Sequence, residues 1–320
     1  MKLFEHPDFD QAVLAAKDHF AALSLPESFI EKDYYVTEAL RLIAARFPSQ
    51  VIFKGGTSLS KGWNLIGRFS EDVDIFLDPA AFDPKLGKNG IDRTMKLMRD
   101  AVKEHPGLTH VPERSQTIGG FGRSDRFAYA PKFPGTAEVA SNVLVEAGAA
   151  SGREPSVELE LRSYVAQFLS ETGGTLGADD ETPFRVRLLH FRRTFVEKLF
   201  TIHSKIEGYR ADGRPVAGYV RHYYDLVLLA RHPEVRAMLA SDEYERIKQD
   251  YDAVSRAAFP RDYRFPADMR FANSEAIYPT GDLKSMLAAE YGKWCRVLCF
   301  GPFPSWEEVE QTFAGLKPLL

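Results

Sequence analysis

The first fifty residues carry apolar positions at helical spacing. In the stretch VTEALRLIAARF these positions are Val36, Leu40, Leu42 and Ile43, close to the 3.6-residue period of a helix with one buried face. The pattern changes at Val51–Lys54, where β-branched and aromatic residues run together and end on a glycine pair. The sequence therefore predicts a helix, then a short strand and a tight turn.

Three further segments have the signature of strands. Asp72–Leu77 (DVDIFL) alternates acidic or aromatic side chains with aliphatic ones, which is the period of two expected for a half-buried strand. The runs Ser141–Ala147 and Ser156–Leu161 are rich in valine and leucine between polar breaks. Residues Thr57–Ser60, just after the glycine pair, are typical of a helix start. These segments predict a sheet in the first half of the chain.

Two segments without regular periodicity, at 79–135 and 173–183, precede a second half of the chain that has helical periodicity. Residues 79–135 are rich in proline, glycine and charge, with one helical island, MKLMRDAVKEH. The segment GGTLGADDETP at 173–183 lacks apolar periodicity and is the best candidate for a linker. Beyond it the pattern is helical nearly to the C-terminus. We therefore expect an α+β fold with two domains, one at residues 1–178 and a mainly helical one at 179–320.

Composition places the chain among ordinary globular proteins. It has 320 residues, of which 44% are hydrophobic and 27% charged, so disordered, collagen-like and coiled-coil proteins are excluded. The N-terminus lacks the pattern of a signal peptide, and no apolar run is long enough for a membrane span. We expect a soluble, cytoplasmic protein with no membrane partner. The net charge is −4, so a nucleic-acid partner would need a local basic patch.

The two cysteines, Cys295 and Cys299, are four residues apart in a predicted helix. Side chains at this spacing share one helical face, which suits a pair of buried thiols. Without a CxxC pair or a nearby histidine cluster, the pattern does not indicate a zinc site.

Candidate chemistry concentrates between residues 53 and 77. Gly55 and Gly56 let the backbone pass close to a bulky anion, and the helix start behind them offers free N–H groups to phosphate oxygens. Asp72 and Asp74 are two apart on a predicted strand, so their carboxylates share one face. Paired carboxylates suit Mg²⁺, which binds one or two of them together with substrate phosphates. A glycine pair is often only a turn, but this order of motifs is the layout of a nucleotidyltransferase site.

A third carboxylate from a neighbouring strand would complete a metal cluster or deprotonate an acceptor hydroxyl. Glu146, which ends the apolar run VLVE, is the first choice. Glu158 and Glu160 are alternatives, and an ordinary strand-end glutamate is the plainer interpretation.

The predicted helices add cationic candidates. Lys198 and Lys205 lie along one helical face, and Arg221 and Asp225 are four apart, so they can pair. Between residues 185 and 236 there are eleven basic residues against five acidic ones, an excess of six in an acidic chain. Aromatic residues are interleaved with them: Phe191, Tyr209, Tyr219, Tyr223 and Tyr224. Such a patch could hold a triphosphate and part of an RNA backbone; a solvated helix face is the alternative.

Five motifs in order, EKDYYVTEAL, FKGGTSLSKGW, RFSEDVDI, RRTFVEKLFTIH and RHYYDL, resemble the AbiEii/AbiGii nucleotidyltransferase toxin family. Its members include phage-defence (abortive-infection) toxins of type IV toxin–antitoxin systems and mycobacterial toxins that modify tRNA. The resemblance extends from about residue 28 to the C-terminus and is weakest at 79–140. It implies a DNA-polymerase-β-like nucleotidyltransferase core with a helical C-terminal domain that completes the active site.

The resemblance also implies roles for individual residues. Asp72 and Asp74 match the pair that binds Mg²⁺ (or Mn²⁺), Lys198 matches the lysine that contacts the triphosphate, and Asp225 matches an essential aspartate. Ser70 matches a site that an antitoxin kinase modifies in some relatives. The expected nucleotide-binding residues are Lys54, Gly55, Gly56, Thr57, Ser58, Ser70, Arg193, Arg221 and His222.

We therefore expect an enzyme that moves a nucleoside monophosphate from an NTP to an RNA 3′ end, above all the tRNA acceptor stem, and so blocks translation. Its partners would be the NTP, the RNA and a cognate antitoxin protein. Two alternatives remain. One is transfer to a hydroxyl of a protein or small molecule; the other is a non-catalytic NTP-binding protein that acts through association.

Overall fold

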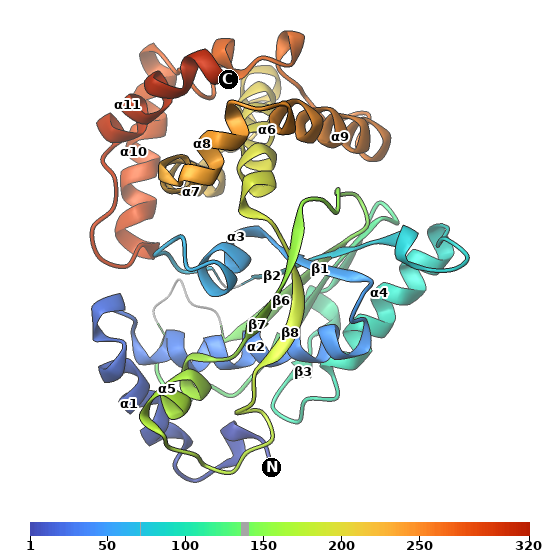
Figure 1. Cartoon of the computed structure of the whole chain (residues 1–320), viewed down its shortest axis with the longest axis vertical. Coiled ribbons are helices and arrows are strands. Elements are labelled where there is room, and N and C mark those ends of the chain that lie inside the picture. The colour runs from blue at the N-terminus through green and yellow to red at the C-terminus, as the bar shows by residue number, and fades with distance from the viewer. Residues whose placement is uncertain (71, 136–140) are drawn as a thin grey trace. The chain divides into compact units, whose positions relative to one another are not determined.

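The computed structural model describes residues 1–70, 72–135 and 141–320 (Figure 1). They form two units. The first contains residues 1–64, 69–149 and 156–189, and the second contains residues 65–68, 150–155 and 190–320. Two short segments of the second unit, 65–68 and 150–155, are thus inserted in the sequence of the first. Glu71, of the acidic motif, lies outside the described residues.

The first unit is built on a mixed sheet with the strand order β3-β5-β6-β2-β1-β8-β7, and β4 pairs with β5 at one side. The strands are β1 (Val51–Lys54), β2 (Asp72–Leu77), β3 (Thr109–His110), β4 (Gln116–Ile118), β5 (Gly122–Ala128), β6 (Asn142–Gly148), β7 (Ser156–Leu161) and β8 (Phe184–Leu189). The predicted strands at 51–54, 72–77, 141–147 and 156–161 are confirmed, with the third shifted by one residue.

Strand β2 occupies the middle of the sheet. It runs antiparallel to β1 and parallel to β6. Its aliphatic residues Val73, Ile75 and Leu77 are fully buried, whereas Asp72 and Asp74 are only partly buried. Because side chains alternate between the faces of a strand, this pattern buries one face of β2 and directs both carboxylates to the other.

Helices cover the apolar side of this sheet. The long helix α2 (Glu27–Arg46) packs on β2, β6 and β8, and α4 (Lys88–Val102) packs on α2 and β5 (Figure 1). Helices α1 (Phe9–His19) and α5 (Tyr164–Thr172) pack on each other and on α2. The helix predicted from the spacing of Val36–Ile43 is confirmed as part of α2.

The second unit is helical. It contains α6 (Phe191–Asp212), α7 (Arg221–Arg231), α8 (Pro233–Leu239), α9 (Asp242–Ala258), α10 (Gly281–Leu298) and α11 (Trp306–Leu316). Helix α7 packs on α6, α8, α10 and α11. Its sequence YYDLVLLA is buried except at Leu228, because a helix enclosed by four others has little polar face left. The predicted α+β fold with a helical C-terminal region is confirmed.

Three predicted local features were wrong. Residues 184–189, assigned to the helical half, form strand β8, which lies between β1 and β7. Their alternating sequence FRVRLL has the period of a strand, and pairing within the sheet selects it. The stretch 79–135, in which only a helical island was predicted, also contains strands β3, β4 and β5, and β5 is seven residues long. Cys299 lies one residue beyond the end of α10 and is only half-buried, while Cys295 is fully buried.

Among the residues that the structure describes, no helix combines the length and the apolar character that crossing a membrane requires.

Candidate active site

The glycine pair forms a sharp turn from β1 into a short helix. This helix begins as α3 (Gly55–Thr57) and continues as a π-helical turn over Ser58–Gly62. Gly55 has φ of +76°, and a Cβ atom there would collide with the carboxylate of Asp74. Both the left-handed backbone and the absence of a side chain are therefore needed at this position. The turn brings the backbone of the glycine pair against the second aspartate of the acidic motif.

Hydroxyl groups fix this turn to the start of β2. Thr57 is 3% exposed; its hydroxyl donates to the backbone carbonyl of Asp72 at 2.6 Å and lies 2.8 Å from the hydroxyl of Ser70. The Ser58 hydroxyl is buried and donates to the carbonyl of Gly55 at 2.9 Å. Ser58 thus stabilises the turn itself, while Thr57 joins it to the acidic strand and to Ser70.

Three carboxylates occupy neighbouring positions in the sheet. Asp74 pairs in register with Lys54 of β1 on one side and with Glu146 of β6 on the other. Paired residues of adjacent strands project to the same face, so Glu146 stands on the face that bears Asp74 and Asp72. The structure thus brings together the first-choice third carboxylate and the predicted pair. Its role as a base or ligand stays a prediction.

The alternative carboxylates lie elsewhere. Glu158 and Glu160 are exposed residues of β7, an edge strand that two strands, β1 and β8, separate from β2. Both are paired with Arg185 of β8, at 3.6 and 3.2 Å. The order of the sheet therefore favours Glu146 over both.

This arrangement suits a divalent metal ion. Asp72, Asp74 and Glu146 offer only carboxylate oxygens, which are the donors that Mg²⁺ and Mn²⁺ prefer. Asp72 and Asp74 are partly buried and Glu146 is exposed, so phosphate oxygens and water can complete the coordination. A magnesium-type site thus fits these residues.

A second group of possible ligands, Glu38, His105 and Asp180, is buried in the first unit. Its members are already engaged with protein groups. The Tyr34 hydroxyl donates to Asp180 at 2.7 Å and lies 3.2 Å from Nε2 of His105. Arg41 donates to Glu38 at 2.7 Å and to the carbonyl of Asp180. We interpret the group as a hydrogen-bonded core network, separate from the acidic face of β2.

The second unit contains a buried cluster of charged groups around Asp225, which is 0% exposed. Arg68 binds this carboxylate with two hydrogen bonds, from Nε to Oδ1 at 2.6 Å and from an Nη to Oδ2 at 2.8 Å. The ammonium group of Lys198 on α6 lies 2.8 Å from Oδ2 and 3.0 Å from Nδ1 of His222. Because an ammonium group only donates, a hydrogen bond between these two groups requires Nδ1 to accept.

The pKa values in this cluster are shifted by burial and by mutual charge. Burial alone would raise the pKa of Asp225, but the charges of Arg68 and Lys198 outweigh it and hold this pKa well below its usual value. Burial lowers the pKa of Lys198. The negative charge of Asp225 offsets this lowering only in part, and the positive charge of Arg68 adds to it. Burial, with Lys198 nearby, lowers the pKa of His222 to about 3. The Asp225 carboxylate is therefore shared by two cationic side chains, and the imidazole ring beside them is neutral.

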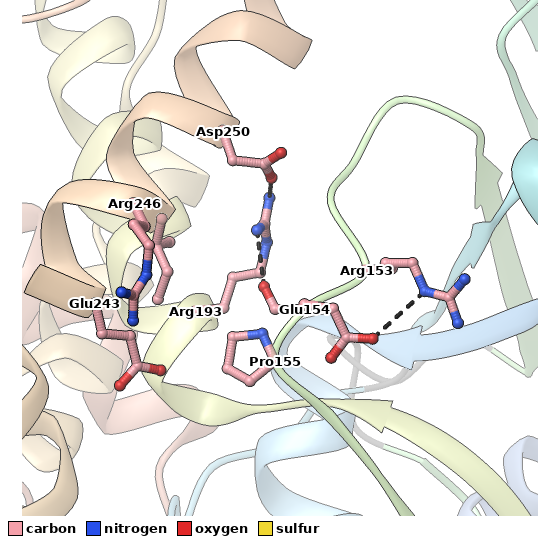
Figure 2. A pocket seen from close by; sticks show the side chains of 8 residues that line it. Arg153, Glu154, Pro155, Arg193, Glu243, Arg246 and Asp250 are labelled. Atoms are coloured by element: carbon pink, nitrogen blue, oxygen red, sulfur yellow. Dashed lines mark hydrogen bonds and ion pairs between the residues drawn. The ribbon is translucent and has the colours of Figure 1, made fainter.

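Arg221 and Arg193 differ from expectation. Asp225 pairs with Arg68 and Lys198 instead of Arg221, and the buried Nε of Arg221 has no hydrogen-bond partner among the described residues. Arg193 is 2% exposed and donates to Glu197. It also donates to Asp250 and to the carbonyl of Glu154 (Figure 2). These bonds link three segments of the second unit.

Arg193 also forms part of the wall of a pocket of about 450 Å³. Figure 2 shows its guanidinium group between Asp250 and the segment that carries Glu154 and Pro155. Gly152 of the same segment has no room for a Cβ atom against Arg193. These contacts indicate that Arg193 stabilises the second unit, whereas the nucleotide-binding role expected for it stays a prediction.

The basic, aromatic-rich stretch at 185–236 is divided between the two units. Arg185 and Arg187 belong to β8 of the first unit, whereas the other nine basic residues of the stretch belong to the second. Three of the interleaved aromatic residues, Phe191, Tyr223 and Tyr224, are at most 3% exposed. They are core residues, because the helices that carry them are enclosed by others. These three aromatic residues therefore do not contribute to the basic patch predicted from this stretch.

Sequence reasoning missed Arg68. It stands in the motif RFSEDVDI, directly before residues that were singled out, but nothing in the local pattern links it to Asp225, 157 positions away. A buried arginine needs a carboxylate partner, and only the folded chain shows which one.

Comparison with known proteins gives one finding. A family described as "AbiEii: Nucleotidyl transferase AbiEii toxin, Type IV TA system" matches residues 39–290, which is more than half of the chain. This range includes the glycine turn, all three carboxylates and the Asp225 cluster. No curated protein and no solved structure matches the chain.

Proposed function

This chain belongs to the AbiEii nucleotidyl transferase toxin family of type IV toxin–antitoxin systems, and we propose that it transfers a nucleoside monophosphate from an NTP to an RNA 3′ end. The family makes the protein a nucleotidyltransferase toxin, with an NTP as substrate and an antitoxin as partner. The finer assignment concerns the acceptor, the metal ion and the residues that act.

The observation that carries the proposal is the register of β2 with its neighbours. Lys54 and Gly55 lie beside Asp74 on one side, and Glu146 lies beside it on the other. A phosphate-binding turn and a carboxylate face at one end of a sheet are what a nucleotidyltransferase needs. We also propose that the sheet of the first unit is the DNA-polymerase-β-like core.

In the proposed reaction, the 3′ oxygen of the acceptor forms a bond to the α-phosphorus of the NTP. The bond from that phosphorus to the bridging oxygen breaks, and pyrophosphate leaves. The proton of the acceptor hydroxyl passes to a carboxylate, for which we propose Glu146. Asp72 and Asp74 would hold Mg²⁺ or Mn²⁺, which lowers the pKa of the hydroxyl and neutralises phosphate charge when it is bound. Gly55, Gly56 and Thr57 would orient the triphosphate.

For the second unit we propose that Lys198 neutralises charge on the leaving pyrophosphate. The reaction would then require residues of both the sheet-bearing region and the helical region at 179–320. The support is electrostatic, because Lys198 belongs to a buried cluster that also contains the cationic group of Arg68. His222 of this cluster, and Arg221 next to it in sequence, would bind the same phosphates.

The RNA acceptor, of which tRNA is the first choice, is supported by the toxin family and by the basic excess at 185–236. We propose that this transfer blocks translation, and that Ser70 is the position at which an antitoxin acts. Ser70 lies beside Thr57 at the glycine turn, so a phosphate group there would repel the NTP.

The experiment is label transfer. Purified protein is incubated with Mg²⁺, each α-labelled NTP in turn and total bacterial RNA, beside an Asp72→Ala/Asp74→Ala variant. A labelled band of tRNA size with the wild type alone supports the proposal. Label in protein would transfer the assignment to protein nucleotidylation, and no label in any acceptor would favour the non-catalytic alternative.

A matched pair of variants tests Glu146. Glu146→Gln removes the proposed base and should slow transfer by about 10²- to 10⁴-fold. Glu158→Gln makes the same change on the edge strand β7 and should leave transfer unchanged. Equal activity of the two variants would remove Glu146 from the mechanism.

A further inference from the structure

The turn that follows the glycine pair is attached to helix α2 by an ion pair. The ammonium group of Lys61, in the π-helical part of this turn, donates to Oδ1 of Asp33 at 2.6 Å. The two side chains are 7% and 13% exposed, so salt screens their attraction less than that of a surface pair. Both residues belong to the first unit. The contact therefore joins the turn to the long helix that packs on the sheet.

Asp33 also holds a third element. Its second oxygen, Oδ2, accepts at 2.9 Å from the backbone N–H of Tyr164, the first residue of α5. A carboxylate suits that position, because the first N–H groups of a helix have no partner within it and form the positive end of its dipole. The Lys61 ammonium group lies 5.4 Å from the centre of the Tyr164 ring. Both oxygens of Asp33 are thus used, and the lysine is held between a carboxylate and an aromatic ring.

Strand β8 restrains the same end of the turn. A Cβ atom at Gly62 would collide with the buried side chain of Leu188, and Nε1 of Trp63 donates to the carbonyl of Leu189 at 3.2 Å. The hydroxyl of Ser60, by contrast, donates to carbonyl groups of the turn itself. Contacts with α2 and β8 therefore place this end of the turn, whereas the hydroxyl within it stabilises only its shape.

The turn depends on such contacts because it is short and irregular. Its helical residues are 55–62, and the N–H of Trp63 bonds to the carbonyl of Ser58, five positions back, at 3.1 Å. A helix of this length does not persist alone in water. In the proposed function, the backbone at Gly55 and Gly56 binds the triphosphate from the start of this helix. A contact that sets the orientation of the turn therefore sets the direction of its anion-binding groups.

We propose that Lys61 and Asp33 are positioning residues for triphosphate binding, whose ion pair orients the turn so that the backbone at Gly55 and Gly56 meets the phosphates. Lys61 does this without contact with the nucleotide, because its ammonium group is bound to Asp33. The proposal rests on the function proposed above and adds two residues to it. The alternative is a purely structural pair that stabilises the packing of α5 on α2.

The experiment removes the charge of each partner at nearly constant shape. Lys61→Met keeps the length of the side chain, and Asp33→Asn keeps an oxygen that can accept from the N–H of Tyr164. The first measurement is binding of inorganic tripolyphosphate with Mg²⁺ by calorimetry, which needs no acceptor and no turnover. We expect affinity to fall about 10- to 100-fold in each variant, the loss typical of residues that orient a ligand-binding group.

Two further variants test whether the ion pair itself is responsible. The double variant Lys61→Met/Asp33→Asn should bind tripolyphosphate no more weakly than either single variant, because all three lack the same interaction. Lys61→Arg should recover part of the affinity, because arginine keeps a charge that can reach Asp33. Losses that multiply in the double variant would show that the two residues act independently and would overturn the positioning role.

Arg123→Met is the matched control. Arg123 and Asp125 form an ion pair of similar burial on β5 of the same unit, with side chains 11% and 5% exposed. Loss of this pair should lower the urea midpoint of unfolding, as the loss of Lys61 does, but leave tripolyphosphate affinity unchanged. If Lys61→Met does not fold, Asp33→Asn provides the same comparison, since it keeps the bond to Tyr164.

Turnover then distinguishes this proposal from the proposed function. The KM for NTP should rise in Lys61→Met in step with the weaker tripolyphosphate binding, with little change in kcat, because the turn binds substrate and transition state alike. If wild type transfers label and both single variants keep its KM for NTP, the positioning role is wrong while the proposed function stands. If tripolyphosphate binding depends on the pair but wild type transfers no label, the proposed function fails and the positioning role survives. If wild type does not bind tripolyphosphate, or if Arg123→Met weakens binding as much as Lys61→Met, the positioning role is overturned.

Discussion

Aspartates occupy two contrasting settings in this protein. Asp72 and Asp74 lie on a face of the central sheet where they are only partly buried, whereas Asp225 is completely buried between two cationic side chains. A partly hydrated carboxylate can exchange its ligands at modest cost. A buried one cannot, because separating it from its partners leaves uncompensated charge in a medium of low polarity. The first setting suits a changing substrate complex, and the second suits a fixed electrostatic element.

The largest effect expected is on turnover. Asp72→Ala or Asp74→Ala should reduce label transfer about a thousandfold or more, because the proposed metal site loses a ligand. The free energy of unfolding should change little, since both side chains keep contact with water. Label transfer and urea unfolding of the same samples measure the two quantities. A variant that retains full activity would exclude its aspartate from the metal site.

Asp225→Asn should show the opposite signature, a large loss of stability together with the loss of activity. Asparagine keeps the shape but removes the buried negative charge that Arg68 and Lys198 share, which costs about 3–5 kcal/mol. Asp262→Asn serves as control, because Asp262 is exposed and its pair with Arg214 is worth at most about 1 kcal/mol. Similar unfolding midpoints for the two variants would show that the buried Asp225 contributes no more to stability than an exposed aspartate.

Gly55→Ala is a smaller test in the first unit. Alanine at φ of +76° is strained by about 1–2 kcal/mol, and its methyl group would displace the Asp74 carboxylate. We expect a raised KM for NTP and a lowered kcat. Gly173→Ala provides the comparison, since Gly173 has a similar φ of +70° with open space around it. We expect Gly173→Ala to strain the backbone but to keep the wild-type KM for NTP and the wild-type kcat.

The remaining prediction concerns acid. Burial is the leading cause that lowers the pKa values of His105 and His190 to about 4 and of His222 to about 3. Below the unfolded value of about 6.5, the unfolded chain binds protons that the folded chain does not. Stability is therefore full above that pH and falls as the pH drops towards 4, by at most about 1.4 kcal/mol per pH unit for each histidine, less where solvent screens the group.

Two of these three histidines, His190 and His222, belong to the second unit. Hydrogen exchange at decreasing pH should therefore show the helical unit loosening before the sheet unit. His190→Asn removes one titrating group and keeps a side chain that can cap α6, where the ring of His190 now accepts from the N–H of Arg192. If the stability of this variant depends on pH as that of wild type does, His190 does not contribute to the loss of stability in acid.

The two settings also differ in how far the sequence could predict them. The acidic pair and the glycine turn stand within twenty residues of each other, and strand periodicity alone places both carboxylates on one face. The cluster around Asp225 needs Arg68 and Lys198, which are far away in sequence. The spacing of Arg221 and Asp225 predicted a local pair instead, because the i, i+4 rule considers only one helix.

The sequence by itself determined the local elements: the long helix before residue 46, the strands at 51–54 and 72–77, the turn between them and most helices after residue 190. Each follows from a repeat of apolar positions or from a residue type with a restricted backbone. Tertiary structure alone decided that β6 pairs with β2, so that Glu146 rather than Glu158 stands beside Asp74. It also decided that Arg68 meets Asp225. Partners distant in sequence are selected by pairing and burial over the whole molecule, and a local pattern contains no information about that choice.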